Sequence, residues 1–348
     1  IAVAVLSIII IIFFTIWIAR KRILAFFKKD KRDDEFEFDV EALIRNYGSF
    51  TPKTYSYANV KKMTDLSKDK IGKGGYGTVY KGRLPDGLLV AVKVLRESKG
   101  NGEEFINEVA SIGRTSHVNI VTLSGFCYER DKRALINEFM PNESLDNFIH
   151  NGSGMANCRL EWKTLSEIAV CIARGLEYLH RGCNTRILHF DIKPQNILLA
   201  KDFCPKISDF GLAKLCKTKE SIVSMLGSIG TAGYIAPEVF SQNFGGVSHK
   251  SDVYSYGMLV LEMIDKDDIV FGAISEEEKE VARKMVLVSL WCIQTNPSDR
   301  PSMTKVVEVL EGPLHSLQIA PKPFLFSPTI AAEDSVTTSQ PSETEKGN

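Results

Sequence analysis

The sequence predicts an α+β protein with a β-rich N-terminal part and a mainly helical C-terminal part, preceded by a single transmembrane helix. Short runs of β-forming residues separated by turn residues lie between positions 71 and 93. Apolar residues recur at three- and four-residue spacing from Leu165 to Leu179, which is the pattern of a buried helix. Residues 1–19 carry no charge, as is typical of a segment that crosses a bilayer.

The composition is that of a globular protein and excludes several classes. Charged residues make up 25% of the 348 positions and hydrophobic residues 44%. Lys plus Arg (43) equals Asp plus Glu (43), so the net charge does not indicate a nucleic-acid partner. The seven cysteines are odd in number and include no C-x-x-C pair, which argues against a disulfide framework or a zinc site and favours a reducing compartment.

Residues 1–19 are long enough to cross a membrane. At ~1.5 Å per residue a helix of this length extends about 28 Å, close to the ~30 Å hydrocarbon core. Arg20, Lys21 and Arg22 follow directly, which places the C-terminal side in the cytoplasm. A signal peptide would need a basic start and a shorter apolar core. We therefore expect a single-pass type I protein in the plasma membrane, and, because the chain starts at Ile1 without methionine, an extracellular part upstream.

Two further segments are expected to lie outside the folded domain. Residues 20–64 read as a cytoplasmic juxtamembrane segment, because the basic cluster is followed by the acidic run Asp33–Glu41 and little periodicity precedes Tyr55. Residues 319–348 are rich in Ser, Thr, Pro and Glu without apolar periodicity, which indicates a disordered tail.

The stretch ILHFDIKPQNILLAKDFCPKISDFG, residues 187–211, contains the residues best suited to catalysis. Short apolar runs flank Asp191, Asn196 and Asp209, as expected for brief strands joined by loops. Such strands can hold polar side chains rigidly over a cleft. Phosphoryl transfer needs a carboxylate to accept the proton of the attacking hydroxyl and oxygen ligands for Mg²⁺.

A glycine-rich segment at residues 71–79 contains G-x-G-x-x-G followed by x-V. Its glycines allow a tight hairpin and a close approach of backbone N–H groups to phosphates. A dinucleotide-binding turn is the alternative, but that turn opens a helix. Here Thr78-Val79-Tyr80, a Pro85-Asp86-Gly87 turn and the run 88–93 form a strand–turn–strand pattern.

These motifs together resemble those of protein kinases. His189-Phe190-Asp191 is similar to the catalytic loop, Asp209-Phe210-Gly211 to the metal-binding motif, and the A-V-K strand ending at Lys93 to the phosphate-binding strand. The resemblance covers Lys70 to Leu317. It implies a bilobal protein-kinase fold at 65–318, with a small lobe at 65–140 and a large lobe at 141–318. A finer resemblance is to plant receptor-like kinases of the leaf-rust-resistance and thaumatin-like receptor kinase group. Three segments carry it: HFDIKPQNILL, GTAGYIAPEVF and LVSLWCIQTNPSDRPSM.

The resemblance implies catalytic and metal-binding roles. Asp191 would be the catalytic base and Lys193 would stabilise the charge of the transferred phosphoryl group. Asn196 and Asp209 would be the Mg²⁺ ligands. Two residues match the pattern of serine/threonine kinases. Lys193 lies two positions after the base, and Thr231 lies in a G-T-x-x-Y sequence.

The resemblance also implies an ATP site. Lys93 would hold the α- and β-phosphates and pair with Glu108, which lies in the predicted helix 103–114. Val79, Ala91 and Leu198 would cover the adenine, and the backbone at Glu138 to Met140 would bond its edge. Asn137 would be the gatekeeper, where the similar kinases usually carry an aromatic residue. The full set is Ile71, Gly72, Lys73, Gly74, Gly75, Tyr76, Gly77, Thr78, Val79, Ala91, Lys93, Glu108, Glu138, Met140 and Leu198.

Two further strands are predicted at 119–121 and 133–136. By resemblance, Asp252 would anchor the catalytic loop and Arg300 would pair with Glu238. Phe190 stands where many kinases have the arginine that binds a phosphorylated activation segment.

The large lobe reads as shortened after Ile264, where the family pattern has several dozen more residues. Missing coding sequence, an alternative transcript and a real deletion all remain open. Two functions follow from these observations. One is a membrane-anchored kinase that transfers the ATP γ-phosphoryl group to Ser/Thr hydroxyls of proteins in receptor signalling, with a co-receptor or extracellular ligand as partner. The alternative is a catalytically impaired pseudokinase scaffold.

Overall fold

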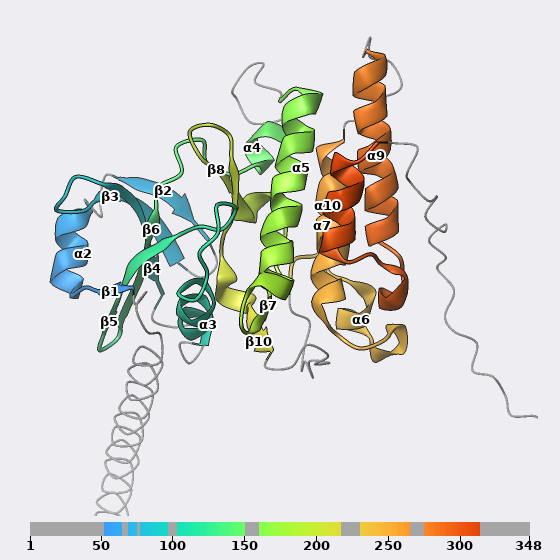
Figure 1. Ribbon diagram of the computed structural model, residues 1–348. Helices are drawn as coiled ribbons and strands as arrows, with labels where there is room; N and C mark the ends of the chain where they lie inside the picture. Colours follow the sequence, from blue (N-terminus) through green and yellow to red (C-terminus); the bar gives the residue numbers. More distant parts are fainter. Residues whose placement is uncertain are drawn as a thin grey trace, which may run out of the picture.

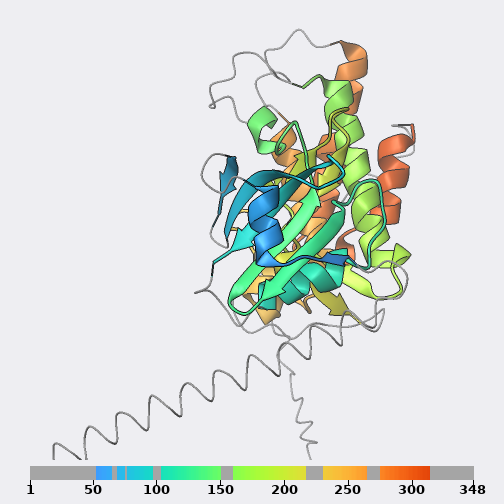
Figure 2. The same cartoon turned by 90° about the vertical axis from the view of Figure 1, so that its left-hand side faces the viewer.

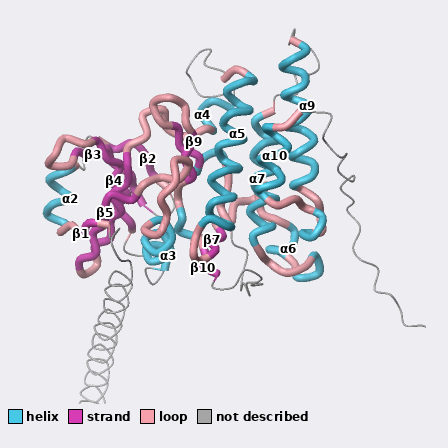
Figure 3. The backbone as a smooth tube through the Cα atoms, in the orientation of Figure 1, coloured by secondary structure: helices cyan, strands magenta, loops and turns pink. Residues whose placement is uncertain are grey.

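A computed structural model describes residues 52–64, 69–74, 77–96, 103–149, 160–216, 230–264 and 275–313. These residues form a β-rich small lobe and a mainly helical large lobe (Figure 1), as the sequence predicted. The large sheet lies in one lobe, and the long helices lie in the other together with a few short strands (Figure 3). Viewed from the small lobe, the sheet lies in front of the large-lobe helices (Figure 2).

The small lobe is built on a six-stranded sheet with the order β1-β5-β6-β4-β3-β2. All neighbours are antiparallel except β1 and β5. The predicted strand–turn–strand around Pro85-Asp86-Gly87 is confirmed as β3 and β4. The strands are β1 (Lys53–Thr54), β2 (Lys70–Lys73), β3 (Gly77–Arg83), β4 (Leu89–Leu95), β5 (Leu123–Glu129) and β6 (Lys132–Glu138).

The two faces of β4 have different neighbours. Val90 and Val92 are buried in a small core that includes Val60 and other side chains around helix α2 (Tyr57–Met63). Because side chains alternate along a strand, Ala91 and Lys93 lie on the opposite face.

Residues 53–63 pack against this sheet, although the sequence placed them in the juxtamembrane segment. Tyr55, Val60 and Met63 are buried there, and Ser56 caps α2 by accepting a hydrogen bond from the Asn59 N–H. This stretch is too short to show a periodic pattern of apolar residues. Its apolar side chains nevertheless bury enough surface to hold the segment against a sheet that other strands form.

Helix α3 (Glu103–Ile112) confirms the predicted helix and ends two residues earlier than expected. Phe105 and Val109 are buried, and the Phe105 ring meets Phe126 edge-on at 5.9 Å between centroids. The helix thereby lies against the sheet on the side of the large lobe (Figure 1).

The predicted strand at 119–121 is wrong. Ile120 forms only an isolated bridge with Ile207, and the strand itself starts at Leu123. The Val121 N–H donates to the Ile207 carbonyl and the Ile207 N–H to the Asn119 carbonyl. The apolar run is therefore held by the large lobe rather than by the sheet. The predicted strand at 133–136 is confirmed within β6.

The large lobe packs helices around one hydrophobic core. The predicted periodic residues are all buried in it, and the helix continues into a π-helical turn at Tyr178–Gly182. The helices are α4 (Asp146–Ile149), α5 (Trp162–Glu177), α6 (Pro237–Phe240), α7 (His249–Met263), α9 (Glu276–Cys292) and α10 (Met303–Glu311). The short strands are β7 (Arg186–Leu188), β8 (Ile197–Leu199), β9 (Pro205–Ile207) and β10 (Lys214–Cys216).

Helices α7 and α9 pack closely below the catalytic region. A Cβ at Gly257 would lie 2.7 Å from the Cβ of Cys292, so only glycine permits this approach. The Tyr256 hydroxyl donates to the Ala169 carbonyl at 3.0 Å, which ties α7 to α5. The expected shortening after Ile264 falls on 265–274, outside the described residues.

The membrane and tail predictions also fall outside the described residues, because these begin at Pro52 and end at Pro313. In the described part of the chain, no helix combines the length and the apolar character that crossing a bilayer requires.

Candidate active site

The catalytic loop is held from below by one buried carboxylate. Asp252 on α7 is fully buried and accepts hydrogen bonds from the backbone N–H groups of His189, at 2.9 Å, and Phe190, at 2.8 Å. Its Oδ2 also lies 2.9 Å from Nε2 of His180. Burial alone would raise the pKa of Asp252, but these donors and the nearby imidazoles hold it below its ordinary value. The predicted anchoring contact is therefore present.

Asp191 lies at the centre of a polar network. Nζ of Lys193 is 2.8 Å from its Oδ2, and the Thr231 hydroxyl donates to its Oδ1 at 2.7 Å. Lys193 also donates to the Thr231 hydroxyl at 2.7 Å. Nδ2 of Asn196 donates to Oδ2 of Asp191 at 2.8 Å. Three side chains, those of Lys193, Asn196 and Thr231, thus fix the orientation of one carboxylate.

His189 supports this loop without contributing chemistry. Its Nε2 donates to the Ser208 carbonyl at 3.0 Å, so its Nδ1 is the acceptor for the Asp191 N–H at 3.2 Å. The ring meets Phe210 edge-on at 4.6 Å. Burial lowers the pKa of His189, which keeps the imidazole neutral and this pattern intact.

Lys93 joins the two lobes through two carboxylates. Its Nζ lies 3.0 Å from Oε2 of Glu108 on α3 and 2.7 Å from Oδ1 of Asp209. Burial alone would lower the pKa of Lys93, but the charges of Glu108 and Asp209 outweigh it and raise that pKa above its ordinary value. The lysine is therefore a fixed positive charge at the cleft. The predicted pairing of Lys93 with Glu108 is present in the geometry.

Asn196 and Asp209 are suited to a hard cation. Asp209 uses Oδ1 for Lys93, and Asn196 uses its amide N–H groups for Asp191, so each retains one side-chain oxygen. The N–H and the hydroxyl of Ser208 both bond the Asn196 carbonyl, which brings the two segments together. Two oxygen ligands with the remaining positions filled by phosphates and water is a common arrangement for Mg²⁺. The residues present therefore fit a divalent metal.

Residues 66–310 match the family model of the protein kinase domain. The PR5-like receptor kinase of Arabidopsis thaliana is 58% identical over 324 residues, which cover 84% of this chain and 48% of that protein. The rust resistance kinase Lr10 of Triticum aestivum is 52% identical over 328 residues, which cover 86% of this chain and 52% of that protein. This chain belongs to the protein kinase family. Its similarity to leaf-rust-resistance receptor-like kinases, predicted from the motifs, is confirmed. The kinase spans about half the length of these curated relatives.

The nucleotide side of the kinase cleft contains the residues expected to cover adenine. Val79 is the cross-strand partner of Lys93, and Ala91 shares that face of β4. Leu198 on β8 is half-buried between two buried neighbours. Met140 is buried just after β6. Val79 and Ala91 thus belong to the small-lobe sheet and Leu198 to the large lobe, and their contact with adenine stays a prediction.

The hinge differs from expectation in one detail. The Glu138 N–H donates to the Thr122 carbonyl at 3.0 Å, so that donor is not available to a base. Its carboxylate accepts from the Thr122 N–H at 2.7 Å and pairs with Lys206 at 3.0 Å, which ties the hinge to β9. Oδ1 of the gatekeeper Asn137 is buried and has no hydrogen-bond partner among the described residues.

The glycine-rich hairpin is described in part. The Gly74 N–H donates to the Gly77 carbonyl at 2.9 Å, and a Cβ at Gly77 would lie 2.4 Å from the Val94 carbonyl oxygen. Glycine at 77 is therefore required for β3 to pair with β4. Gly75 and Tyr76 lie outside the described residues.

Phe190 packs where an arginine would bind phosphate. Its ring is buried in a cluster with Leu188, Cys216 and Val247, and its backbone has a left-handed φ of 62°. An apolar cluster thus joins the catalytic loop to β10. The absence of a phosphate clamp at Phe190 stays a prediction.

The activation segment ends at a buried ion pair. Arg300 holds Glu238 with two parallel hydrogen bonds of 2.7 and 2.8 Å, and both side chains are fully buried. Ser251 adds a third hydrogen bond to Glu238 at 2.7 Å. The pairing predicted for Arg300 is present.

Sequence reasoning missed two supporting residues. Asn107 donates to the Gly211 carbonyl at 3.1 Å, which links α3 to the segment after Asp209. Ser208 bonds Asn196 as described above. Asn107 directly precedes Glu108, and Ser208 directly precedes Asp209. In the sequence, only this position beside a motif residue could have indicated their supporting role.

Proposed function

We propose that this chain is a membrane-anchored serine/threonine kinase that transfers the ATP γ-phosphoryl group to protein hydroxyls. The observation that supports it best is that both halves of the machinery are assembled together. Lys93 contacts Glu108 and Asp209, while Asp191 is held by Lys193 and other polar side chains. In this family such an arrangement positions the phosphates and the attacking hydroxyl at the same time.

The reaction follows from the positions of these groups. The substrate hydroxyl gives its proton to the Asp191 carboxylate as its oxygen bonds to the γ-phosphorus, and the bond from that phosphorus to the β–γ bridging oxygen breaks to leave ADP. Lys93 neutralises phosphate charge on the nucleotide side. Lys193, beside Asp191, neutralises the transferred group. When bound, Mg²⁺ at Asn196 and Asp209 supplies further positive charge at the phosphates.

The preference for Ser/Thr is supported by the contacts of Thr231. Its hydroxyl bonds both Lys193 and Asp191. Thr231 thereby ties the end of the activation segment to the catalytic loop. Its short side chain occupies the position next to Asp191. A serine or threonine hydroxyl has a short reach and needs to come close to Asp191.

The membrane part of the proposal rests on sequence. Residues 1–19 are the proposed anchor of a type I plasma-membrane protein, with 20–64 leading to a cytoplasmic kinase domain at 65–318 and a tail at 319–348. The packing of residues 53–63 on the sheet extends the folded unit upstream of 65. Protein substrates, the bilayer and a co-receptor or extracellular ligand are the proposed partners.

The test is phosphate transfer by the full chain in detergent micelles. We expect radiolabel from γ-labelled ATP in the kinase itself and in dephosphorylated casein, with phosphoserine and phosphothreonine after acid hydrolysis. Asp191→Asn removes the base and should lower the rate about 10²- to 10⁴-fold. Asp86→Asn, the same change in an exposed turn, is the matched control and should keep the wild-type rate.

The pseudokinase alternative predicts a different result. If wild type and Asp191→Asn transfer label equally slowly while both bind an ATP analogue, the chain acts as a nucleotide-binding scaffold. Label found mainly on tyrosine would contradict the assigned specificity while leaving the kinase assignment intact.

A further inference from the structure

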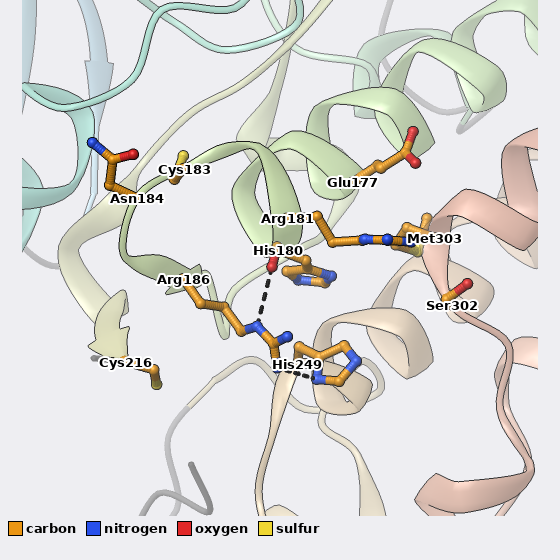
Figure 4. Close-up of a pocket in the computed structure, with 10 residues that line it drawn as sticks. All are labelled: Glu177, His180, Arg181, Cys183, Asn184, Arg186, Cys216, His249, Ser302 and Met303. Carbon is orange, nitrogen blue, oxygen red and sulfur yellow. Dashed lines mark hydrogen bonds between the residues drawn. The ribbon is translucent and has the colours of Figure 1, made fainter. Parts of the chain in front are cut away.

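A cavity lies behind the catalytic loop, on the side of helices α5, α7 and α10. It has a volume of about 370 Å³ and is bounded by the end of α5, β7, and the starts of α7 and α10 (Figure 4). Cavities of roughly 300–1,000 Å³ accept small molecules. Phosphoryl transfer as described above uses none of its lining residues.

Two arginines line this cavity without a carboxylate partner among the described residues. Arg186 donates from Nε to the His180 carbonyl and from Nη1 to Nδ1 of His249, both at 3.1 Å. Arg181 donates to the Thr304 hydroxyl at 3.0 Å. In Figure 4, Arg186 extends from the turn after His180 towards the His249 ring. Among the described residues that line the wall, Glu177 is the one carboxylate. The positive charge of both guanidinium groups is therefore held by neutral atoms.

The two histidines on the wall add hydrogen-bonding groups. Because arginine can only donate, Nδ1 of His249 is the acceptor and its proton is on Nε2. Burial above all, together with the neighbouring Arg186 and Lys250 charges, lowers the pKa of His249 to about 3, although Asp252 opposes the shift, so the ring is neutral. Nδ1 of His180 is buried and has no hydrogen-bond partner among the described residues.

The start of α10 contributes to the same wall. Ser302 caps this helix by accepting from the Lys305 N–H, and both Ser302 and Met303 line the cavity. A helix N-terminus carries partial positive charge and favours anions. This adds to the two guanidinium groups.

We propose that this cavity binds the phosphate group of a small phosphorylated ligand and that its occupancy is transmitted to the catalytic loop. A phosphate offers three terminal acceptor oxygens, enough for two guanidinium groups and an imidazole N–H, whereas a carboxylate offers two. The cavity is larger than a single anion requires, so the ligand is a phosphomonoester with a small organic part.

The route to the catalytic loop is short. Nε2 of His180 bonds Oδ2 of Asp252, and Asp252 in turn accepts from the N–H groups of His189 and Phe190. A ligand that reorients His180 therefore alters the hydrogen bonding of Asp252, the carboxylate that holds the N–H groups of His189 and Phe190.

The experiment is calorimetric titration of the full chain in detergent, with a non-hydrolysable ATP analogue and Mg²⁺ saturating the nucleotide cleft. Glucose 6-phosphate and inorganic phosphate are the probes, with sodium chloride at equal ionic strength as the reference. We expect saturable binding of glucose 6-phosphate, at least tenfold weaker in Arg186→Gln and unchanged in Arg283→Gln, an exposed arginine on α9. If Arg186→Gln fails to fold by circular dichroism, Arg181→Gln on the exposed rim replaces it.

Several outcomes would overturn the proposal. If neither glucose 6-phosphate nor inorganic phosphate gives a saturable heat of binding, the site does not exist. If the wild type and both pocket variants bind glucose 6-phosphate with equal affinity, the ligand binds elsewhere. Equal or tighter binding of inorganic phosphate rules out a role for the organic part. Transmission is read from amide hydrogen exchange at His189–Asp191, which should slow with glucose 6-phosphate in wild type and not in Arg186→Gln. Binding without this change refutes transmission. None of these readouts needs phosphate transfer, so they stand apart from the catalytic test.

Discussion

Replacing Asp252 with asparagine tests whether one buried carboxylate positions the catalytic loop. Asp252 is fully buried and accepts three hydrogen bonds, from the N–H groups of His189 and Phe190 and from Nε2 of His180. Asparagine has nearly the same shape but keeps only one acceptor oxygen. If that oxygen faces the Phe190 N–H, the amide NH₂ faces the His189 N–H, and two donors then meet.

The size of the effect follows from these contacts. A buried donor left without an acceptor costs about 1–3 kcal/mol, and the retained bond loses roughly 1 kcal/mol because its acceptor is no longer charged. His180 can adopt its other tautomer and accept from the new amide, so this third contact survives. We expect a loss of about 2–4 kcal/mol, within the ~5–15 kcal/mol stability of a typical domain. A displacement of about 1 Å at the base costs roughly 10²-fold in rate.

Three measurements check this prediction. Urea unfolding followed by tryptophan fluorescence gives the loss of stability, labelled-ATP transfer gives the rate, and calorimetry gives the affinity for an ATP analogue. That affinity should stay near the wild-type value, because the hydrogen bonds of Asp252 among the described residues go to His180 and the catalytic loop rather than to Lys93. Asp86→Asn is the control and should change stability by less than about 0.5 kcal/mol. If Asp252→Asn were as stable and as fast as this control, the carboxylate would not hold the loop.

Four other outcomes are expected. Lys93→Ala should weaken Mg²⁺-dependent binding of an ATP analogue at least about tenfold, because it removes a charge held at the phosphates; equal affinity by calorimetry would refute its role. Alanine at four activation-segment hydroxyls should change the transfer rate less than about threefold, far less than Asp191→Asn, because Phe190 offers phosphate no donor. The four are Thr218, Ser221, Ser224 and Ser228. A collapse of activity in both this variant and phosphatase-treated wild type, with the fold intact, would mean that another cation binds the phosphate. Deleting residues 1–19 should abolish sedimentation with membranes at high salt, where the basic flank is screened; continued sedimentation would reveal another anchor. Finally, the pKa of His249 falls from 6.5 to about 3 in the folded state, so the unfolded chain binds a proton first as the pH drops below 6.5. The free energy of unfolding should then fall more steeply in wild type than in His249→Gln, and parallel curves from urea titrations would contradict this.

The residues of the catalytic centre were predictable from the sequence because each lies in a local motif whose backbone geometry is set by its neighbours. Asp191 and Asn196 share one short loop, and Asp209 follows β9, the second strand after that loop. Lys93 ends a run of β-formers after a turn, and Glu108 lies on a helix whose apolar face is readable from its period. Their local motifs could therefore be read from the sequence, and the roles expected of these residues follow from the resemblance of those motifs to protein kinases.

The small-lobe edges were decided by packing. Residues 119–121 have the composition of a strand, but the Ile207 backbone holds them in place. Residues 53–63 show little periodicity, yet Tyr55, Val60 and Met63 bury apolar surface on a sheet that other segments build. In both cases the deciding partner lies far away in the chain, where local spacing carries no information.

The cavity behind the catalytic loop is the clearest case of a feature that only the tertiary structure decided. Arg186 lies on β7, His249 at the start of α7 and Ser302 at the start of α10, and no spacing in the sequence relates them. What unites them is the way α7 and α10 pack beside the end of α5. The sequence by itself indicated, through motifs that resemble those of protein kinases, which residues are expected to carry out phosphoryl transfer. The packing of distant helices determined where two arginines without a carboxylate partner among the described residues come together, because burial and charge separation depend on the whole fold.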